Sequence, residues 1–189
     1  MLRLRAAHGM YVAAALPRRL CNSHINGYAR KRGRVFGPVD MVMINDVYNK
    51  KILGLAADIP HLRRLSDADA SAIAHSKLCG SKVTVDLKMK DGVVTDFGHD
   101  VKACALGQAS SSIMARHVVG ATGPELRALR EQMYKMLKEE GPPPSGRWAD
   151  CEALLPVRDF KARHASTLLT FDAVVDAVNQ IEAKQGVAA

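Results

Sequence analysis

A regular alternation of apolar and polar residues in the middle of the chain constrains the fold more than any other feature. It occupies residues 81–103, SKVTVDLKMKDGVVTDFGHDVKA, with Asp91-Gly92 near its centre. The apolar positions before the Asp-Gly pair are Val83, Val85, Leu87 and Met89. Successive side chains of a strand point to opposite faces, and Asp-Gly is the strongest short-range signal for a two-residue hairpin turn. The stretch therefore predicts two antiparallel strands with one buried face.

The segments on either side of the hairpin predict a third strand and several helices. Residues 71–78, SAIAHSKL, alternate more weakly and indicate a strand that reverses at Cys79-Gly80. Apolar residues recur at helical spacing elsewhere, and the expected helices cover residues 43–59, 106–120, 122–141 and 166–184, with a short helix or turn at 147–157. We expect Thr122 to cap the third of these helices and Ser166 or Thr167 to cap the last. This order predicts an α+β fold in which helices pack on one face of a small antiparallel three-stranded sheet.

Positive charge is concentrated at the start of the chain. Residues 1–40 hold eight Arg and Lys side chains and one acidic side chain, whereas residues 41–189 hold 19 basic and 18 acidic ones. We divide the chain into a basic extension at 1–42, a folded domain at 43–184 and a tail at 185–189. The extension is interpreted as a disordered segment, or as residues translated upstream of a start at Met41 or Met43. An Arg-rich organelle transit peptide is the alternative interpretation.

Hydropathy and cysteine spacing exclude several classes of protein. No stretch approaches the about 18–20 consecutive apolar residues that a transmembrane helix needs. The four cysteines, Cys21, Cys79, Cys104 and Cys151, include no Cys-x-x-Cys pair, which argues against a zinc finger or a thioredoxin motif. The domain keeps three of them, an odd number poorly suited to a disulfide framework. We therefore expect a reducing compartment, which is the cytoplasm, or the mitochondrial matrix if residues 1–42 are a transit peptide.

Two of the cysteines are expected to lie at one edge of the sheet. Cys79 precedes the first hairpin strand and Cys104 follows the second, and antiparallel pairing brings those two points together. Cys104 also precedes a helix, whose dipole favours a thiolate. His164 is expected just before the last helix, and Cys, Cys and His form a natural ligand set for zinc or for iron–sulfur chemistry. Spacing alone leaves two interpretations open, a metal site or packed cysteines with a surface histidine.

A longer pattern resembles a known family. Residues 76–120, SKLCGSKVTVDLKMKDGVVTDFGHDVKACALGQASSSIMARHVVG, combine a Cys-Gly turn, a hairpin, a second cysteine and small residues with a serine run. This pattern resembles the core of the iron–sulfur cluster assembly scaffolds of the IscU, SufU and NifU N-terminal family. The similarity continues through HASTLLTFDAVVDAV, residues 164–178, and covers about residues 43–184.

The resemblance implies a ligand set and reveals two departures from the family pattern. Cys79 and Cys104 match the first and second cysteines of the family, and His164 matches the histidine beside its third cysteine. That third cysteine is replaced by Ala165, and the acidic residue two positions after the first cysteine is replaced by Ser81. The implied metal and cluster ligands are therefore Cys79, Cys104 and His164, with the fourth ligand unassigned.

In many members of the family the third cysteine accepts sulfur and is a ligand of the cluster. Its replacement by Ala165 therefore affects both sulfur acceptance and the completion of four ligands around the metal. Cys151, an exogenous thiol and a cysteine of a partner protein are three candidates to replace it. Cys151 lies in ADCEALL, a segment expected to form a helical turn, and is interpreted first as a packed small residue.

The resemblance implies a scaffold that is not an enzyme. Such proteins accept persulfide sulfur from a cysteine desulfurase, combine it with iron, hold a labile 2Fe-2S cluster and pass it to apo-proteins. The expected cofactor is thus a 2Fe-2S cluster or iron, and the expected partners are the desulfurase and the acceptor proteins. The alternative is a zinc-binding or metal-free regulatory partner of a desulfurase that has lost scaffold chemistry. We expect no membrane and no nucleic-acid partner; nucleic-acid binding through the basic extension would be salt-sensitive and would vanish without residues 1–42.

Overall fold

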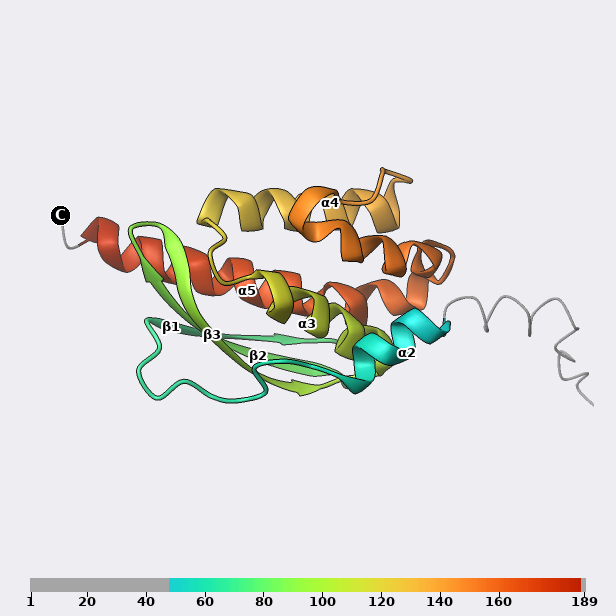
Figure 1. Ribbon diagram of the computed structural model, residues 1–189, viewed down its shortest axis with the longest axis horizontal. Helices are drawn as coiled ribbons and strands as arrows, with labels where there is room; N and C mark the ends of the chain where they lie inside the picture. The colour runs from blue at the N-terminus through green and yellow to red at the C-terminus, as the bar shows by residue number, and fades with distance from the viewer. Residues whose placement is uncertain (1–47, 188–189) are drawn as a thin grey trace, which may run out of the picture. The chain divides into compact units, whose positions relative to one another are not determined.

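The structure, a computed structural model, describes residues 48–187 (Figure 1). Its elements in chain order are α2 (Lys50–Ala57), β1 (Ala70–His75), β2 (Lys82–Lys90), β3 (Val93–Lys102), α3 (Ala105–His117), α4 (Gly123–Lys138), the 3-10 helix η1 (Gly146–Asp159) and α5 (Lys161–Val187). The basic extension at 1–42, residues 43–47 of the expected first helix and the last two residues of the tail lie outside the described residues.

The predicted hairpin is confirmed. Strands β2 and β3 pair antiparallel, beginning with Lys82 opposite Lys102. Asp91 and Gly92 connect them with φ angles of 52° and 76°, the two positive values that a two-residue turn of the type I′ class requires. The apolar face of β2 is buried as predicted, through Val83, Val85, Leu87 and Met89.

A third strand completes the sheet, in the order β1-β2-β3 with antiparallel neighbours. Strand β1 ends at His75, three residues before the predicted end of the strand. The chain then turns, because Gly80 adopts a φ of 70° and its N–H donates to the carbonyl of Ser76 at 2.9 Å. Cys79 therefore lies in a tight turn between β1 and β2.

The helices that contact the sheet lie on one of its faces, as Figure 1 shows. Helices α3 and α5 pack directly against the strands, α4 packs against α5, and α2 packs against α3. The 3-10 helix η1 packs against α3, α4 and α5. The largest fully buried side chains of the described residues include Phe97, Leu106, Ile113, Met133 and Phe171. This arrangement confirms the predicted α+β class.

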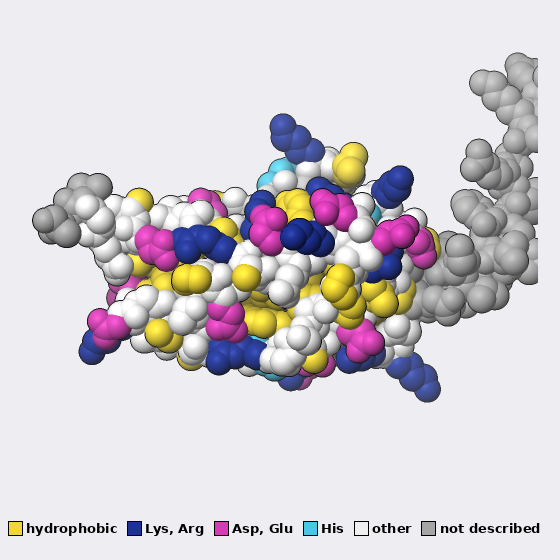
Figure 2. All heavy atoms as spheres, turned by 90° about the horizontal axis from the view of Figure 1, so that it is seen from above, with side chains coloured by type: hydrophobic (Ala, Val, Ile, Leu, Met, Phe, Trp, Pro, Cys, Tyr) yellow, Lys and Arg dark blue, Asp and Glu magenta, His cyan; other side chains and the backbone are white. Residues whose placement is uncertain are grey.

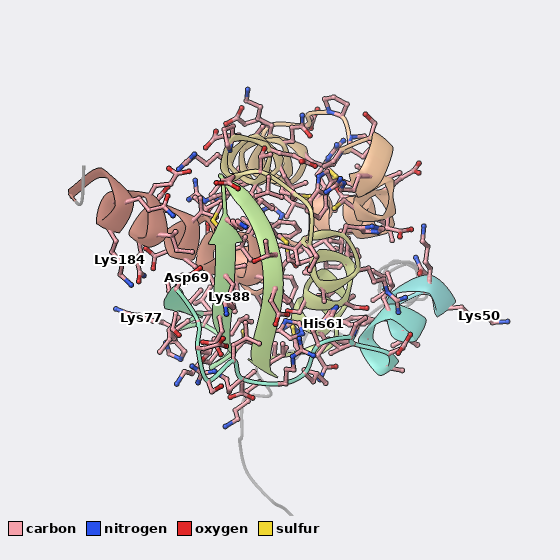
Figure 3. The ribbon with its side chains drawn as sticks, turned by 60° about the vertical axis from the view of Figure 1, so that its left-hand side comes forward. Lys50, His61, Asp69, Lys77, Lys88 and Lys184 are labelled. Atoms are coloured by element: carbon pink, nitrogen blue, oxygen red, sulfur yellow. The ribbon has the colours of Figure 1, made fainter. Side chains whose placement is uncertain are left out.

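The opposite face of the sheet is covered in part by the connector between α2 and β1, residues 58–69. Figure 3 shows His61 on this connector beside the sheet, and the His61 carbonyl accepts from the N–H of His99 at 3.2 Å. A Cβ on Gly98 would lie 2.5 Å from the carbonyl oxygen of Arg63, so glycine permits this close approach. The connector therefore packs backbone to backbone against β3.

A buried carboxylate fastens the connector to the sheet. Asp86 of β2 is 0% exposed and accepts two hydrogen bonds from the Arg64 guanidinium, at 2.5 and 2.8 Å, and one from the N–H of Leu65 at 3.0 Å. The Ser71 hydroxyl adds a fourth at 2.5 Å. Burial opposes ionisation of Asp86, but these hydrogen bonds outweigh it and lower the pKa of the carboxyl. The alternation predicted one buried face, and this prediction was wrong at Asp86 and Thr84, which are both buried. At Asp86 the cause is the connector, which covers this side chain.

Two helix starts follow from capping residues. The Thr122 hydroxyl accepts from the N–H of Glu125 at 3.3 Å, which confirms the predicted cap of α4. The Asn49 side chain accepts from the N–H of Ile52 at 3.0 Å and caps α2, which begins at Lys50 within the expected range 43–59. Both caps satisfy backbone donors that the first helical turn leaves free.

The start of the last helix was predicted wrongly. Helix α5 begins at Lys161, directly after the break at Phe160, and not at Ser166 or Thr167. The hydroxyls of Ser166 and Thr167 each donate to the Arg163 carbonyl at 3.0 Å, so they are engaged inside the helix and do not cap it. His164 consequently lies in the first turn of α5, and the helix runs past the predicted end at 184 to Val187.

Charges of both signs are interspersed on the face viewed from the α4 side (Figure 2). This mixture agrees with the near balance of 19 basic and 18 acidic side chains in residues 41–189. Among the described residues, no helix has the length and apolar character needed to cross a bilayer.

Candidate functional site

Cys79 is an exposed thiol in the turn between β1 and β2. Its Sγ lies 3.0 Å from the hydroxyl oxygen of Ser81 and 3.4 Å from that of Ser76, two buried serines at the ends of the same turn. The turn is closed by a hydrogen bond from the Ser76 N–H to the Ser81 carbonyl at 2.8 Å. The local backbone thus holds two hydroxyls against one sulfur.

Cys104 occupies the N-cap position of α3, in extended conformation with φ −65° and ψ 168°. Its N–H donates to the Ser81 hydroxyl at 3.3 Å, so Ser81 contacts both cysteines. The hairpin register explains this contact, because Lys82 pairs with Lys102 and each cysteine lies just beyond that pair. The structure therefore brings Cys79 and Cys104 to the same edge of the sheet.

Helix α5 adds a third serine to this edge. Ser166 is 1% exposed, and its Oγ lies 3.5 Å from the Sγ of Cys104. Glycine at position 107 of α3 permits the contact, since a Cβ there would lie 3.0 Å from the Ser166 carbonyl oxygen. The two thiols are therefore surrounded by hydroxyls from the turn and from α5.

The electrostatic surroundings favour the thiolate of Cys79. Hydrogen bonds from Ser76 and then Ser81 outweigh partial burial and lower the pKa of Cys79 to about 7. Both cysteines line a hollow of about 360 Å³ together with Lys102. A thiolate in such a place is both nucleophilic and a good metal ligand.

His164 is placed by η1 and is not in contact with the thiols. It is 7% exposed, and its Nε2 lies 2.9 Å from the Arg158 carbonyl and 3.2 Å from the Val157 carbonyl. Carbonyl oxygens only accept, so Nε2 carries a hydrogen that it donates to them. Within residues 48–187, no group of three or more His, Cys, Asp and Glu side chains is arranged to hold a metal ion.

Ala165 lines a second hollow, of about 800 Å³, on the other side of the first turns of α5. His164, His75 and Tyr134 also line it. Ala165, which stands where the family pattern has its third cysteine, is therefore exposed and offers only a methyl group.

Comparison with protein families decides to which family this arrangement belongs. The model of the NifU-like N terminal domain matches residues 47–185. The chain belongs to the NifU-like N-terminal domain family.

Relatives of this NifU-like domain are found among curated proteins. The iron–sulfur cluster assembly scaffold protein IscU of Thermotoga maritima is 27% identical over 135 residues, which is 71% of this chain and 94% of that protein. The protein of the same name from Streptococcus pyogenes serotype M1 is 23% identical over 121 residues, 64% of this chain and 76% of that protein.

Solved structures show the same fold. The crystal structure of the N-terminal part of a nitrogen-fixing NifU-like protein from Brucella abortus has a TM-score of 0.74 and 66% identity, and the match covers 75% of this chain and 99% of that one. A SUF-system protein from Fervidobacterium islandicum has a TM-score of 0.66 at 17% identity, over 71% of this chain and 98% of that one. At that lower identity the likeness concerns the fold alone.

The remaining cysteine of the described NifU-like domain is a core residue. Cys151 of η1 is 0% exposed, and burial raises the pKa of its thiol to about 12. A thiol in this state is a weak ligand and a weak nucleophile. The structure thus supports the packing interpretation of Cys151.

The three serines are the part of the site that sequence reasoning missed. Ser81 was noted only as a departure from the family pattern, and Ser166 only as a possible helix cap. Ser76 and Ser81 flank Cys79 closely enough in sequence for a local signal, whereas Ser166 lies 62 residues from Cys104. Two thiols surrounded by hydroxyls form a set of sulfur and oxygen donors suited to soft and borderline metal ions.

Proposed function

We propose that this chain is an iron–sulfur cluster assembly scaffold that holds a 2Fe-2S cluster, or iron on the way to one, and passes it to apo-proteins. The observation that carries the proposal is the Ser81 hydroxyl, which contacts the thiol of Cys79 and the backbone N–H of Cys104 and so joins two free cysteines at an accessible edge. Membership of the NifU-like N-terminal domain family and similarity to the two IscU scaffold proteins support it.

The ligands proposed for this cargo are Cys79, Cys104 and His164. Thiolates are the usual ligands of iron in such clusters. His164 donates its Nε2 hydrogen to backbone carbonyls, which is the way a ligating histidine is usually oriented, and this leaves Nδ1 for the metal. Among the described residues, the hydrogen bonds of His164 go to two carbonyls of η1 and none goes to the thiols.

The proposed partners are a cysteine desulfurase, which supplies sulfur, and the proteins that accept the finished cluster. An exposed Cys79 and a hollow open to solvent allow both kinds of partner to reach the site. In this role the chain binds and releases its cargo and catalyses no reaction of its own. Free thiols of this kind persist in a reducing compartment.

Anaerobic reconstitution tests the proposal. The full chain is incubated with ferrous iron, a sulfide source and a thiol reductant, desalted, and analysed by visible absorption and by iron and acid-labile sulfide content. We expect a cluster in the wild type, strong loss in the Cys79→Ala plus Cys104→Ala variant, and full loading in Cys151→Ala. His164→Ala is expected to make the cluster more labile.

The absence of a cluster in the wild type, or an undiminished cluster in the double variant, would contradict the proposal. A second candidate function is favoured by Ala165, which stands where the family pattern has its third cysteine. It is a zinc-binding or metal-free regulatory partner of a desulfurase. Elemental analysis of freshly purified protein separates the two, because stoichiometric zinc, or no metal together with failed reconstitution, would support this second function.

A further inference from the structure

The side chain of α5 that reaches the thiols is Ser166, one residue after the position of the missing cysteine. Consecutive side chains of an α-helix point about 100° apart. Accordingly Ala165 is exposed and lines the 800 Å³ hollow, whereas Ser166 is 1% exposed and contacts the sulfur of Cys104. A ligand contributed by α5 beside the thiols is therefore available from position 166.

The Ser166 hydroxyl presents lone pairs to the site. Its hydrogen is donated along the helix to the Arg163 carbonyl at 3.0 Å. Since a hydroxyl carries one hydrogen and two lone pairs, the oxygen faces the sulfur atoms as an acceptor. The same orientation suits a neutral donor to a metal ion, and binding in this way requires no proton transfer.

The distance between donors matches a shared metal ion. A tetrahedral ion with sulfur at about 2.3 Å and oxygen at about 2.0 Å separates these two ligand atoms by about 3.5 Å. Ser166 Oγ and Cys104 Sγ are 3.5 Å apart. An ion can therefore bind between them with little movement of either side chain.

Of the three serines, Ser166 is the best placed for this role. Ser81 Oγ lies closer to its cysteine, 3.0 Å from Cys79 Sγ, and already accepts from the Cys104 N–H. Ser76 belongs to the same turn as Cys79 and contacts only that thiol among the described cysteines. Of the three serines, Ser166 alone contacts the sulfur of Cys104 through its side chain, while its own hydrogen is donated to the Arg163 carbonyl.

We propose that Ser166 supplies an oxygen ligand to the metal held by Cys79 and Cys104, in place of the thiolate absent at Ala165. This inference rests on the proposed function, because it names the remaining ligand of the same site. A mixed sulfur and oxygen set holds a soft cargo less firmly than a full set of thiolates. Oxygen ligation at Ser166 therefore favours release of the cargo.

Cobalt(II) is the probe for the test, since its visible spectrum reports both the number of thiolate ligands and the coordination geometry. The full chain is titrated anaerobically, with affinity measured by competition against a chelator. We expect Ser166→Ala to weaken cobalt binding by about 10-fold or more and to change the ligand-field bands. We expect Ser166→Cys to restore tight binding and to raise the thiolate charge-transfer intensity by about one half, as for three thiolates in place of two.

Thr167→Val is the matched control. The Thr167 hydroxyl donates to the same Arg163 carbonyl at the same 3.0 Å, so valine removes an equivalent helix contact of similar shape without touching the thiols. We expect its cobalt affinity and spectrum to equal those of the wild type. Near-ultraviolet circular dichroism of each metal-free variant confirms that the fold is retained.

The outcomes separate this inference from the proposed function. Cysteine-dependent binding in the wild type with unchanged affinity and spectrum in Ser166→Ala would overturn the ligand role of Ser166 and leave the scaffold proposal intact. Equal weakening in Thr167→Val would also overturn it, because the effect would then come from the helix. Failure of the wild type to bind iron or cobalt through its cysteines would overturn both.

Discussion

Gly107 of α3 and Ser166 of α5 are in such close contact that a Cβ on the glycine would lie 3.0 Å from the serine carbonyl oxygen. The same Cβ would lie 2.8 Å from the Cβ of Ala103. The absence of a side chain at one position of α3 thus determines how near α5 comes to Cys104. Packing between two helices and the geometry of the candidate site are therefore coupled.

Gly107→Ala is expected to destabilise the protein although alanine favours helix formation. The added methyl group forces backbone atoms apart, and overpacking of this kind costs about 1–3 kcal/mol. Urea unfolding measures the change in the free energy of unfolding. Gly54→Ala in α2 is the control, because a Cβ there meets nothing within 4 Å and helix propensity should stabilise it by about 0.5–1 kcal/mol. If both variants changed the free energy of unfolding in the same direction, the close contact between Gly107 and α5 would be contradicted.

Cys79 is expected to react with iodoacetamide as a thiolate. The pH profile of its alkylation rate should have a midpoint near pH 7. Its pKa is lowered to about 7, so the thiolate fraction, and with it the alkylation rate, rises as the pH increases through that value. Ser81→Ala removes one hydroxyl that stabilises the thiolate and should move the midpoint to higher pH. The rate is followed by mass spectrometry of the Cys79 peptide.

Ser145→Ala provides the control for this profile, because Ser145 is exposed and makes no side-chain cap at the start of η1. Its profile should superimpose on that of the wild type. A midpoint for Cys79 well above pH 8 in the wild type, or one that Ser81→Ala does not move, would show that the serines do not set the reactivity.

Cys151 is expected to contribute to stability and not to cluster binding. Its thiol is 0% exposed with a pKa raised to about 12, so at neutral pH it stays protonated inside the core. Cys151→Ala should lower the free energy of unfolding by about 1 kcal/mol, as expected for a small cavity, and leave the iron content after reconstitution unchanged. A loss of bound iron without a loss of stability would instead assign Cys151 to the site.

Asp86→Asn is expected to weaken the attachment of the connector to the sheet. It should also change how the free energy of unfolding falls as the pH is lowered. Removing a charged acceptor from a buried set of hydrogen bonds costs about 1–3 kcal/mol. The folded-state pKa of Asp86 is lowered, so its stabilisation is present at neutral pH, above the unfolded pKa, and is lost as pH falls through the folded pKa. Urea unfolding at a series of falling pH values measures this. The free energy of unfolding of Asp86→Asn should decrease less with falling pH than that of the wild type.

Asp96→Asn is the comparison for this experiment. Asp96 pairs with Arg63 at 2.7 Å, but both side chains are substantially exposed, at 39% and 53%. An exposed pair contributes at most about 1 kcal/mol. Equal effects of the two substitutions would argue against a special role for the buried carboxylate.

The hairpin and the meeting of Cys79 with Cys104 could be predicted from the sequence because both follow from local rules. The two-residue alternation around Asp91-Gly92 specifies the pairing of β2 with β3, and antiparallel pairing then places the ends of these strands together. The cap at Thr122 could be predicted for the same reason, since a cap depends on neighbours three residues away.

The start of α5 and the contacts of Ser166 could not be predicted, because they depend on residues far apart in the chain. A serine before an apolar run looks like a cap, and only the break at Phe160 and the packing of η1 place it inside the helix. The burial of Asp86 likewise depends on a connector that returns to cover the sheet.

The sequence by itself thus determined the fold class, the family and the pair of cysteines, because short-range pairing rules and a long family pattern specify them. Only the tertiary structure decided that three serines surround these thiols, that Cys151 is a core residue and that Ser166, not Ala165, lies beside them. The physical reason is that α3 and α5 pack closely at Gly107, where α5 contributes Ser166. These two residues are 59 positions apart in the sequence, so no local pattern connects them.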